Sequence, residues 1–236
     1  MSRMSRKDMK RDELATTLES LTLAAEHHAR SLLIAAAAAV VLIAAVSAGV
    51  WYSRSRASEA ALQFAQLQHA VDAPIVPAGA PGMLTYPTTQ ARAEEILRRA
   101  DTLVSSNPSS RQGRWAAYWK AVAQKDLGRH DEALATLAPL ASSQDDPFLS
   151  ASARMQQAQV SEAKGDLSGA AEAYAGLAAS APPRFPVEMA LMAQARVLEA
   201  QGKGEEAKAI YRRVTQEYPE SPYAGDAGRR LAPATS

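Results

Sequence analysis

A set of residues recurs at a fixed interval of 37 positions through the second half of the chain. Glycine marks this interval at Gly128, Gly165 and Gly202. Four further columns keep the same step: Ala121, Ala158 and Ala195; Ala133, Ala170 and Ala207; Leu137, Tyr174 and Tyr211; and Leu140, Leu177 and Val214. Five columns in one register indicate a structural repeat, in which similar units stack on one another.

Each unit reads as a helix, a tight turn and a second helix. In the third unit, residues 188–201 and residues 205–218 have helical patterns, and a segment that begins with Gly202 separates them. Glycine accepts the left-handed backbone conformation that ends many helices. The alanine columns stand where two helices must approach closely. Because such a hairpin cannot bury its apolar face alone, we expect the units to stack into a superhelix.

These columns resemble the pattern of the tetratricopeptide repeat family over about residues 111–232. The family's turn glycine and its two small positions fall on the glycine and alanine columns, and its aromatic position falls on Tyr174 and Tyr211, with Leu137 substituting. The family unit is about 34 residues long, so the longer period here suggests longer first helices. The resemblance implies an all-α fold: a tetratricopeptide-type α-solenoid of helix hairpins with a 37-residue period.

Two more helical patterns precede the repeats, within residues 57–110, and a proline- and glycine-rich loop at residues 72–88 joins them. We interpret this region as a degenerate first hairpin that carries an insertion. Residues 111–236 then contain three repeats and end in a capping helix at residues 221–231.

Residues 31–53 contain no charged side chain, a run of 23 positions between Arg30 and Arg54. As a helix, at about 1.5 Å per residue, such a run spans the hydrocarbon layer of a membrane, which is about 30 Å thick. Trp51 and Tyr52 stand at its end, where aromatic rings favour the headgroup region. A buried alanine-rich core helix and a cleaved signal peptide are the alternatives. We interpret the run as an uncleaved single transmembrane helix in contact with membrane lipid.

Basic residues flank this run unequally. Only Arg54 and Arg56 follow it closely, whereas six precede it: Arg3, Arg6, Lys7, Lys10, Arg11 and Arg30. By the positive-inside rule, the basic tail at residues 1–30 stays in the cytoplasm and the rest is exported. Leucines at helical spacing in the tail indicate a short amphipathic helix, with a frayed tail as the alternative. The predicted topology is a single pass with the C-terminal domain exported.

The sequence carries no pattern that indicates catalysis. It has no cysteine, which removes thiol nucleophiles, disulfides and iron–sulfur clusters. Its four histidines have no metal-ligand spacing, and there is no phosphate-binding loop. The net charge of +1 argues against general electrostatic binding of nucleic acid. We predict a protein that is not an enzyme, with no cofactor, metal, small-molecule substrate or nucleic-acid partner.

The resemblance to the tetratricopeptide family also implies a concave groove lined by set positions of each first helix. Counted back from the turn glycines, the predicted protein-binding residues are Trp115, Tyr118, Val122, Met155, Gln159, Met189, Met192 and Arg196. Methionine and aromatic side chains give such a groove a soft apolar surface that adapts to varied partners. The alternative is that these side chains pack against neighbouring helices or against the loop at residues 72–88.

A short cytoplasmic tail, one anchor and an exported repeat array are similar in layout to the membrane-anchored ancillary subunit of the bacterial Sec translocon. This similarity implies a protein of the bacterial inner membrane with its C-terminal domain in the periplasm. It also implies a protein-interaction scaffold whose groove contacts polypeptides, the translocon or a periplasmic chaperone. The alternative is a structural scaffold subunit of a cell-envelope machine for cell division, outer-membrane assembly or secretion, which holds one folded partner permanently.

Overall fold

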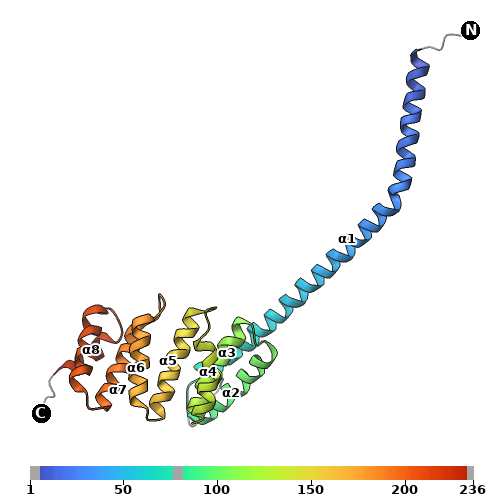
Figure 1. Ribbon diagram of the computed structural model, residues 1–236. Helices are drawn as coiled ribbons and strands as arrows, with labels where there is room; N and C mark the ends of the chain where they lie inside the picture. The colour runs from blue at the N-terminus through green and yellow to red at the C-terminus, as the bar shows by residue number, and fades with distance from the viewer. Residues whose placement is uncertain (1–5, 77–81, 233–236) are drawn as a thin grey trace, which may run out of the picture. The chain divides into compact units, whose positions relative to one another are not determined.

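The computed structural model (Figure 1) describes residues 6–76 and 82–232, with side chains from residue 33 onward. These residues form helices and connecting loops, with one isolated β-bridge between Ile75 and Tyr86. The expected all-α class is therefore confirmed. The helices are α1 (Arg6–Asp72), α2 (Thr89–Ser106), α3 (Arg111–Asp126), α4 (His130–Ala141), α5 (Pro147–Ala163), α6 (Leu167–Ser180), α7 (Val187–Ala200), α8 (Gly204–Glu217) and α9 (Ala224–Leu231).

Helix α1 is longer than the sequence predicted. We expected a short helix in the tail, a separate transmembrane helix and a new helix from residue 57, but one continuous helix of 67 residues covers all three. The charge pattern divides this stretch, whereas the backbone has no reason to break, because it contains no proline and its single glycine is Gly49. Residues 1–5 of the predicted tail lie outside the described residues.

The chain divides into two compact units, residues 1–58 and residues 59–236. In the first unit, the apolar part of α1 is long enough to cross a membrane, and none of its most apolar stretch is buried. Leu33, Val41 and Ile43 each keep about two thirds or more of their surface exposed. A buried core helix, one of the two alternatives above, requires the opposite.

The second unit is an array of helix hairpins that follow one another in chain order (Figure 1). The end of α1 pairs with α2, then α3 with α4, α5 with α6, and α7 with α8, and α9 packs on α8. The three turn glycines Gly128, Gly165 and Gly202 have φ of 74°, 85° and 77°. The predicted left-handed helix ends are therefore confirmed, and the solenoid fold with them.

The periodic columns form the core of this array. Every alanine of the two alanine columns is at most 2% exposed, so the helices do approach closely at these positions. Tyr174 and Tyr211 are among the largest fully buried side chains of the protein. The core is continuous from α5 to α9, and separate clusters lie between the first two hairpins and between α3, α4 and α5.

The first hairpin closes through a small backbone contact in its loop. The amide of Val76 donates to the carbonyl of Tyr86 at 2.9 Å, and the amide of Tyr86 donates to the carbonyl of Pro74 at 3.0 Å. Helix α2 then begins where the Thr88 hydroxyl accepts from the amide of Ala91. These bonds bring the two ends of the inserted loop together and so hold α2 against α1.

Candidate protein-binding face

The eight predicted groove residues do not line one continuous groove. Trp115 lines a hollow near the first hairpin, and Tyr118 and Val122 are half-buried on α3. The other five line a second hollow of about 250 Å³ between α5, α7, α8 and α9, which we call the C-terminal hollow: Met155, Gln159, Met189, Met192 and Arg196.

Met155 differs from its expected exposed position. It is only 4% exposed and belongs to the core with Ala151, Ala158 and Tyr174. The register counted from the turn glycine is right for the face of α5, but the long thioether side chain fills space between stacked helices instead of facing solvent. Packing against neighbouring helices thus covers most of the Met155 side chain, and only a small part of it borders the C-terminal hollow.

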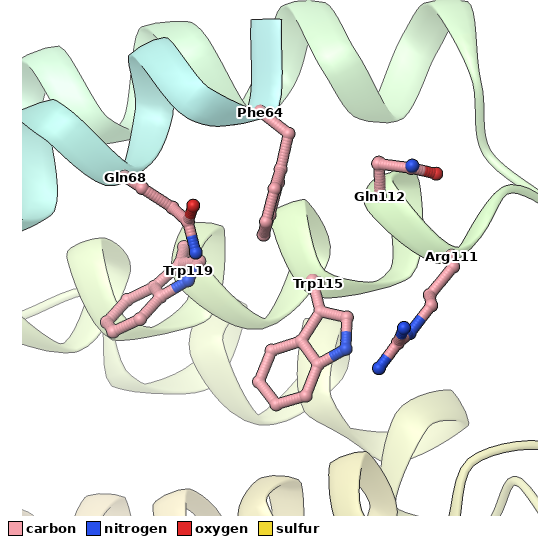
Figure 2. A pocket seen from close by; sticks show the side chains of 6 residues that line it. All are labelled: Phe64, Gln68, Arg111, Gln112, Trp115 and Trp119. Atoms are coloured by element: carbon pink, nitrogen blue, oxygen red, sulfur yellow. The ribbon is translucent and has the colours of Figure 1, made fainter. Parts of the chain in front are cut away.

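The hollow near the first hairpin is the larger of the two, at about 340 Å³ (Figure 2). Phe64 extends from α1 toward α3, where Trp115 and Trp119 project one helical turn apart. Polar groups lie beside these rings, so the hollow combines apolar walls with hydrogen-bonding side chains. We call it the aromatic hollow, and its lining residues are Phe64, Gln68, Arg111, Gln112, Trp115 and Trp119.

Aromatic contacts continue outward from this hollow. Tyr118 meets Trp115 and Trp119 edge to face, with ring centroids 5.6 Å and 5.2 Å apart. Trp115 lies 6.3 Å from Phe148 at the start of α5, and Phe148 lies 5.9 Å from Phe185. Contacts of this kind hold aromatic rings in fixed positions. Phe148 is 42% exposed, so it extends the apolar surface beyond the hollow itself.

Sequence reasoning missed most of this surface. Phe64, Trp119 and Phe148 were not among the predicted binding residues. Trp119 had a usable signal, because it follows Trp115 by four positions and so lies on the same helical face. Phe64 lies before the periodic region and Phe148 starts a helix, so neither belongs to one of the five columns.

One charge stands at the rim of the aromatic hollow. The side chain of Arg111 is 76% exposed, and its Nε lies 4.0 Å from a carboxylate oxygen of Asp146. That carboxylate also caps α5, because its Oδ1 accepts from the amide of Leu149 at 3.0 Å. Arg111 is therefore only loosely paired within the protein.

Burial also affects Tyr118, which contacts both tryptophans. The Tyr118 hydroxyl accepts a hydrogen bond from Nε2 of Gln156 on α5, at 3.3 Å. Burial raises the pKa of Tyr118 above its ordinary value, and this hydrogen bond opposes the rise. Tyr118 is thus a neutral fixed element that supports the aromatic surface.

The C-terminal hollow has a different chemistry. Glu162 of α5 accepts hydrogen bonds from the Tyr174 hydroxyl at 3.1 Å and from Nη2 of Arg196, on the next hairpin, at 2.9 Å. One repeat later, Glu199 accepts from Arg230 of α9 at 3.0 Å. Tyr211 of α8 lies beside this second pair, near enough for Glu199 to affect its hydroxyl. We call these two sets the Glu–Tyr–Arg networks.

The networks change the acidity of their tyrosines. Burial, followed by the nearby Glu162 carboxylate, raises the pKa of Tyr174 well above its usual range. Burial, followed by the nearby Glu199 carboxylate, raises the pKa of Tyr211 to about 12. The hydrogen bond to Glu162 also raises the pKa of Arg196. The charges in the C-terminal hollow are thus engaged with one another.

Comparison with known proteins identifies the fold family. A family model described as a tetratricopeptide repeat-like domain matches residues 26–227, which is most of the chain. The chain belongs to this family. Searches of the curated proteins and of the solved structures find no significant match.

Tetratricopeptide-like arrays are typically non-enzymatic scaffolds that bind other proteins, and membership in this family suggests that the present repeats serve as a protein-interaction scaffold. The described residues contain no group of three or more histidine, aspartate or glutamate side chains placed to hold a metal ion. The aromatic hollow presents an apolar surface beside the loosely paired Arg111, and the C-terminal hollow presents a polar surface whose charged side chains pair within the protein.

Proposed function

We propose that this protein is a single-span membrane protein that holds its repeat array in the periplasm and binds extended polypeptides there. In this role it acts beside the protein-export machinery and its chaperones, as an ancillary translocon subunit does. The observation that carries the proposal is the aromatic hollow, an apolar surface with fixed rings on an array whose family binds proteins.

The anchor is supported by the exposed apolar face of α1 and by the residues at its end. Trp51 and Tyr52 are 73% and 54% exposed, and the guanidinium of Arg56 lies 4.8 Å from the centre of the Tyr52 ring. Amphipathic rings and arginine together suit the boundary between lipid and water. The family match begins at residue 26, ahead of the apolar run, so this run is part of the matched region. A segment removed after export is less consistent with that extent.

The orientation rests on the unequal basic flanks of the run, six residues before it and two soon after it. An alkaline phosphatase fused after Ser236 is expected to be active, and a fluorescent protein that folds only in the cytoplasm is expected to stay dark. The reverse result would place the array in the cytoplasm and exclude a role among exported chains.

Binding is tested most directly by photo-crosslinking from Phe148, because this ring is exposed beside the aromatic hollow. The full-length protein carries a photoreactive phenylalanine analogue at this position, and intact cells are irradiated. We expect crosslinks to chains in transit, which disappear when export is blocked. The matched control carries the analogue at Arg212, an exposed position on α8.

Two other outcomes are informative. Crosslinks to one stoichiometric partner that persist when export is blocked favour the alternative role, a structural scaffold of an envelope machine. Crosslinks no stronger than those from the Arg212 control remove the aromatic hollow as a binding site.

A further inference from the structure

Three side chains follow one line along α3 at the rim and floor of the aromatic hollow. Arg111, Trp115 and Trp119 are spaced four residues apart, so they lie on the same helical face. Four residues of α-helix rise about 6 Å. The line therefore presents one charged and two aromatic groups at steps of about 6 Å, over about 12 Å in all.

An extended polypeptide has nearly the same step. Side chains on one side of a strand belong to alternate residues, and two residues of strand advance about 6.7 Å. Over two steps, the difference from the α3 line is about 1.4 Å, which side-chain rotation absorbs. Alternate side chains of an extended segment can therefore meet Trp119, Trp115 and Arg111 in turn.

The size of the hollow favours an extended occupant over a helical one. The hollow has a volume of about 340 Å³. A helix with its side chains is about 10–12 Å across and fills roughly 1,100 Å³ over about 12 Å of length, so it would rest on the rim of the hollow. An extended segment is narrower, since neighbouring strands in sheets lie about 4.8 Å apart, so it can enter the hollow.

The polar groups of the hollow suit the backbone of such a segment. Amide and carbonyl groups that leave water need hydrogen-bond partners, and an extended segment carries these groups along both edges. Gln68 on α1 and Gln112 on α3 line opposite sides of the hollow (Figure 2). Each side-chain amide has both a donor and an acceptor, so it can bind a backbone group of either kind.

The charge of Arg111 determines which side chain of the occupant suits this end of the α3 line. Arg111 is 76% exposed, and the nearest carboxylate, that of Asp146, lies 4.0 Å away and also caps α5. An arginine fork pairs best with a carboxylate in close contact. The charge complementary to this end of the line is thus an acidic side chain of the occupant.

We propose that the aromatic hollow selects an extended polypeptide segment with bulky apolar side chains at two alternate positions and an acidic side chain at the next alternate position. The apolar side chains pack on Trp119 and Trp115, and the carboxylate pairs with Arg111. This inference rests on the proposed function and specifies the segments that the array binds.

The protein supplies its own probe for a test. It has three tryptophans, and two of them, Trp115 and Trp119, line the hollow. In a Trp51→Phe variant of the full chain, held in lipid nanodiscs, tryptophan fluorescence reports on the hollow alone. The probe ligands are short serine peptides with leucine at two alternate positions and glutamate two residues further on. A composition-matched peptide has the same residues spaced four apart, as a helical ligand requires.

We expect the alternating peptide to change the fluorescence and to bind about tenfold more tightly than the peptide with helical spacing. Lysine in place of its glutamate weakens binding about threefold at low salt. In the Arg111→Glu variant this preference reverses, so that the lysine peptide binds better. The Arg212→Glu variant, changed at an exposed arginine outside the hollow, keeps the original preference. Circular dichroism checks that the Arg111→Glu and Arg212→Glu variants are folded. If Arg111→Glu does not fold, Arg111→Gln replaces it, and this variant should bind the glutamate and lysine peptides equally.

Equal binding of the two spacings overturns the proposal, and so does a glutamate preference that survives both substitutions of Arg111. A fluorescence that no peptide changes also overturns it. If crosslinks from Phe148 to exported chains persist in that case, the proposed function stands and only the selectivity is wrong. If these crosslinks are absent as well, both fail.

Discussion

The junctions between neighbouring hairpins differ along the array. The two C-terminal junctions carry the Glu–Tyr–Arg networks, in which a glutamate on the first helix of a hairpin binds an arginine two helices further along the chain. At the first junction of the repeats, the same columns hold Lys125, Leu137 and Gln159. Lys125 pairs with its neighbour Asp126 at 3.3 Å, within its own helix. The first junction thus lacks all three members of the network.

Other packing features are shared by the first repeat and the two C-terminal repeats. The turn glycines and the buried alanine columns occur in all three repeats. A second periodic contact also occurs twice, since Lys164 binds Asp131 and, one period on, Gln201 binds Ser168. The networks are therefore an addition to a common scaffold. They join the C-terminal hairpins, whereas the first junction, which lies beside the aromatic hollow, lacks this network.

The largest expected effect tests the close helix contacts that all three repeats share. Ala133→Leu, Ala170→Leu and Ala207→Leu should each lower the free energy of unfolding by about 1–3 kcal/mol, because each alanine is fully buried between close helices. Ala173→Leu, at an exposed position of α6, should change it by less than about 0.5 kcal/mol. Urea unfolding of the detergent-solubilised chain, followed by circular dichroism, measures both. An unchanged Ala170→Leu variant would mean that the alanine columns are not close contacts.

The next effect tests the difference between the first junction and the two C-terminal junctions. Glu162→Ala leaves the buried Tyr174 hydroxyl and Arg196 without their acceptor, so it should cost about 1–2 kcal/mol of unfolding free energy. Most of this cost comes from the tyrosine, since Arg196 is half exposed to water. Lys125→Ala, in the same column of the first repeat, should cost less than about 0.5 kcal/mol. If the same urea experiment shows equal losses of unfolding free energy in the two variants, the junctions do not differ in stability.

The parts that sequence predicted are those that recur. Turn glycines and buried alanines repeat because the same backbone geometry and the same close approach repeat, so spacing alone exposes them. The glutamate and tyrosine of the networks also follow the 37-residue step, from Glu162 to Glu199 and from Tyr174 to Tyr211. Arg196 and Arg230 are only 34 positions apart, because the last junction is shorter, so this pairing required the structure.

The binding surface was harder to predict because it depends on departures from the repeat. The aromatic hollow joins a helix that precedes the periodic region to the first repeat, and no column relates Phe64 to Trp115. A family register places a residue on a face, but it does not decide between groove and core. Met155 lies on the expected face of its helix and is nevertheless buried, since a flexible side chain follows the available space.

Alkaline pH should weaken the last C-terminal junction through Tyr211. An unfolded tyrosine has a pKa of about 10, whereas Tyr211 in the folded protein has a pKa of about 12. The folded state therefore holds its proton more tightly, and the stability from this group is complete below about pH 10 and is lost as the pH rises toward 12. The urea midpoint should fall over this range, and less so in Tyr211→Phe. A Tyr211→Phe variant that falls as steeply as the original protein would contradict this assignment.

The smallest effect comes from building the missing network at the first junction. The triple variant Lys125→Glu, Leu137→Tyr and Gln159→Arg places all three side chains in the columns that they occupy one repeat later. We expect an increase in unfolding free energy of less than about 1 kcal/mol. The new hydrogen bonds are offset in part because Asp126 loses its lysine partner and faces a new glutamate. The control Lys125→Glu alone has the added carboxylate without either donor, so it should be less stable than the original chain. If the triple variant is no more stable than this control, then the three residue types do not form the network by themselves, and the C-terminal junctions owe it to the surrounding packing.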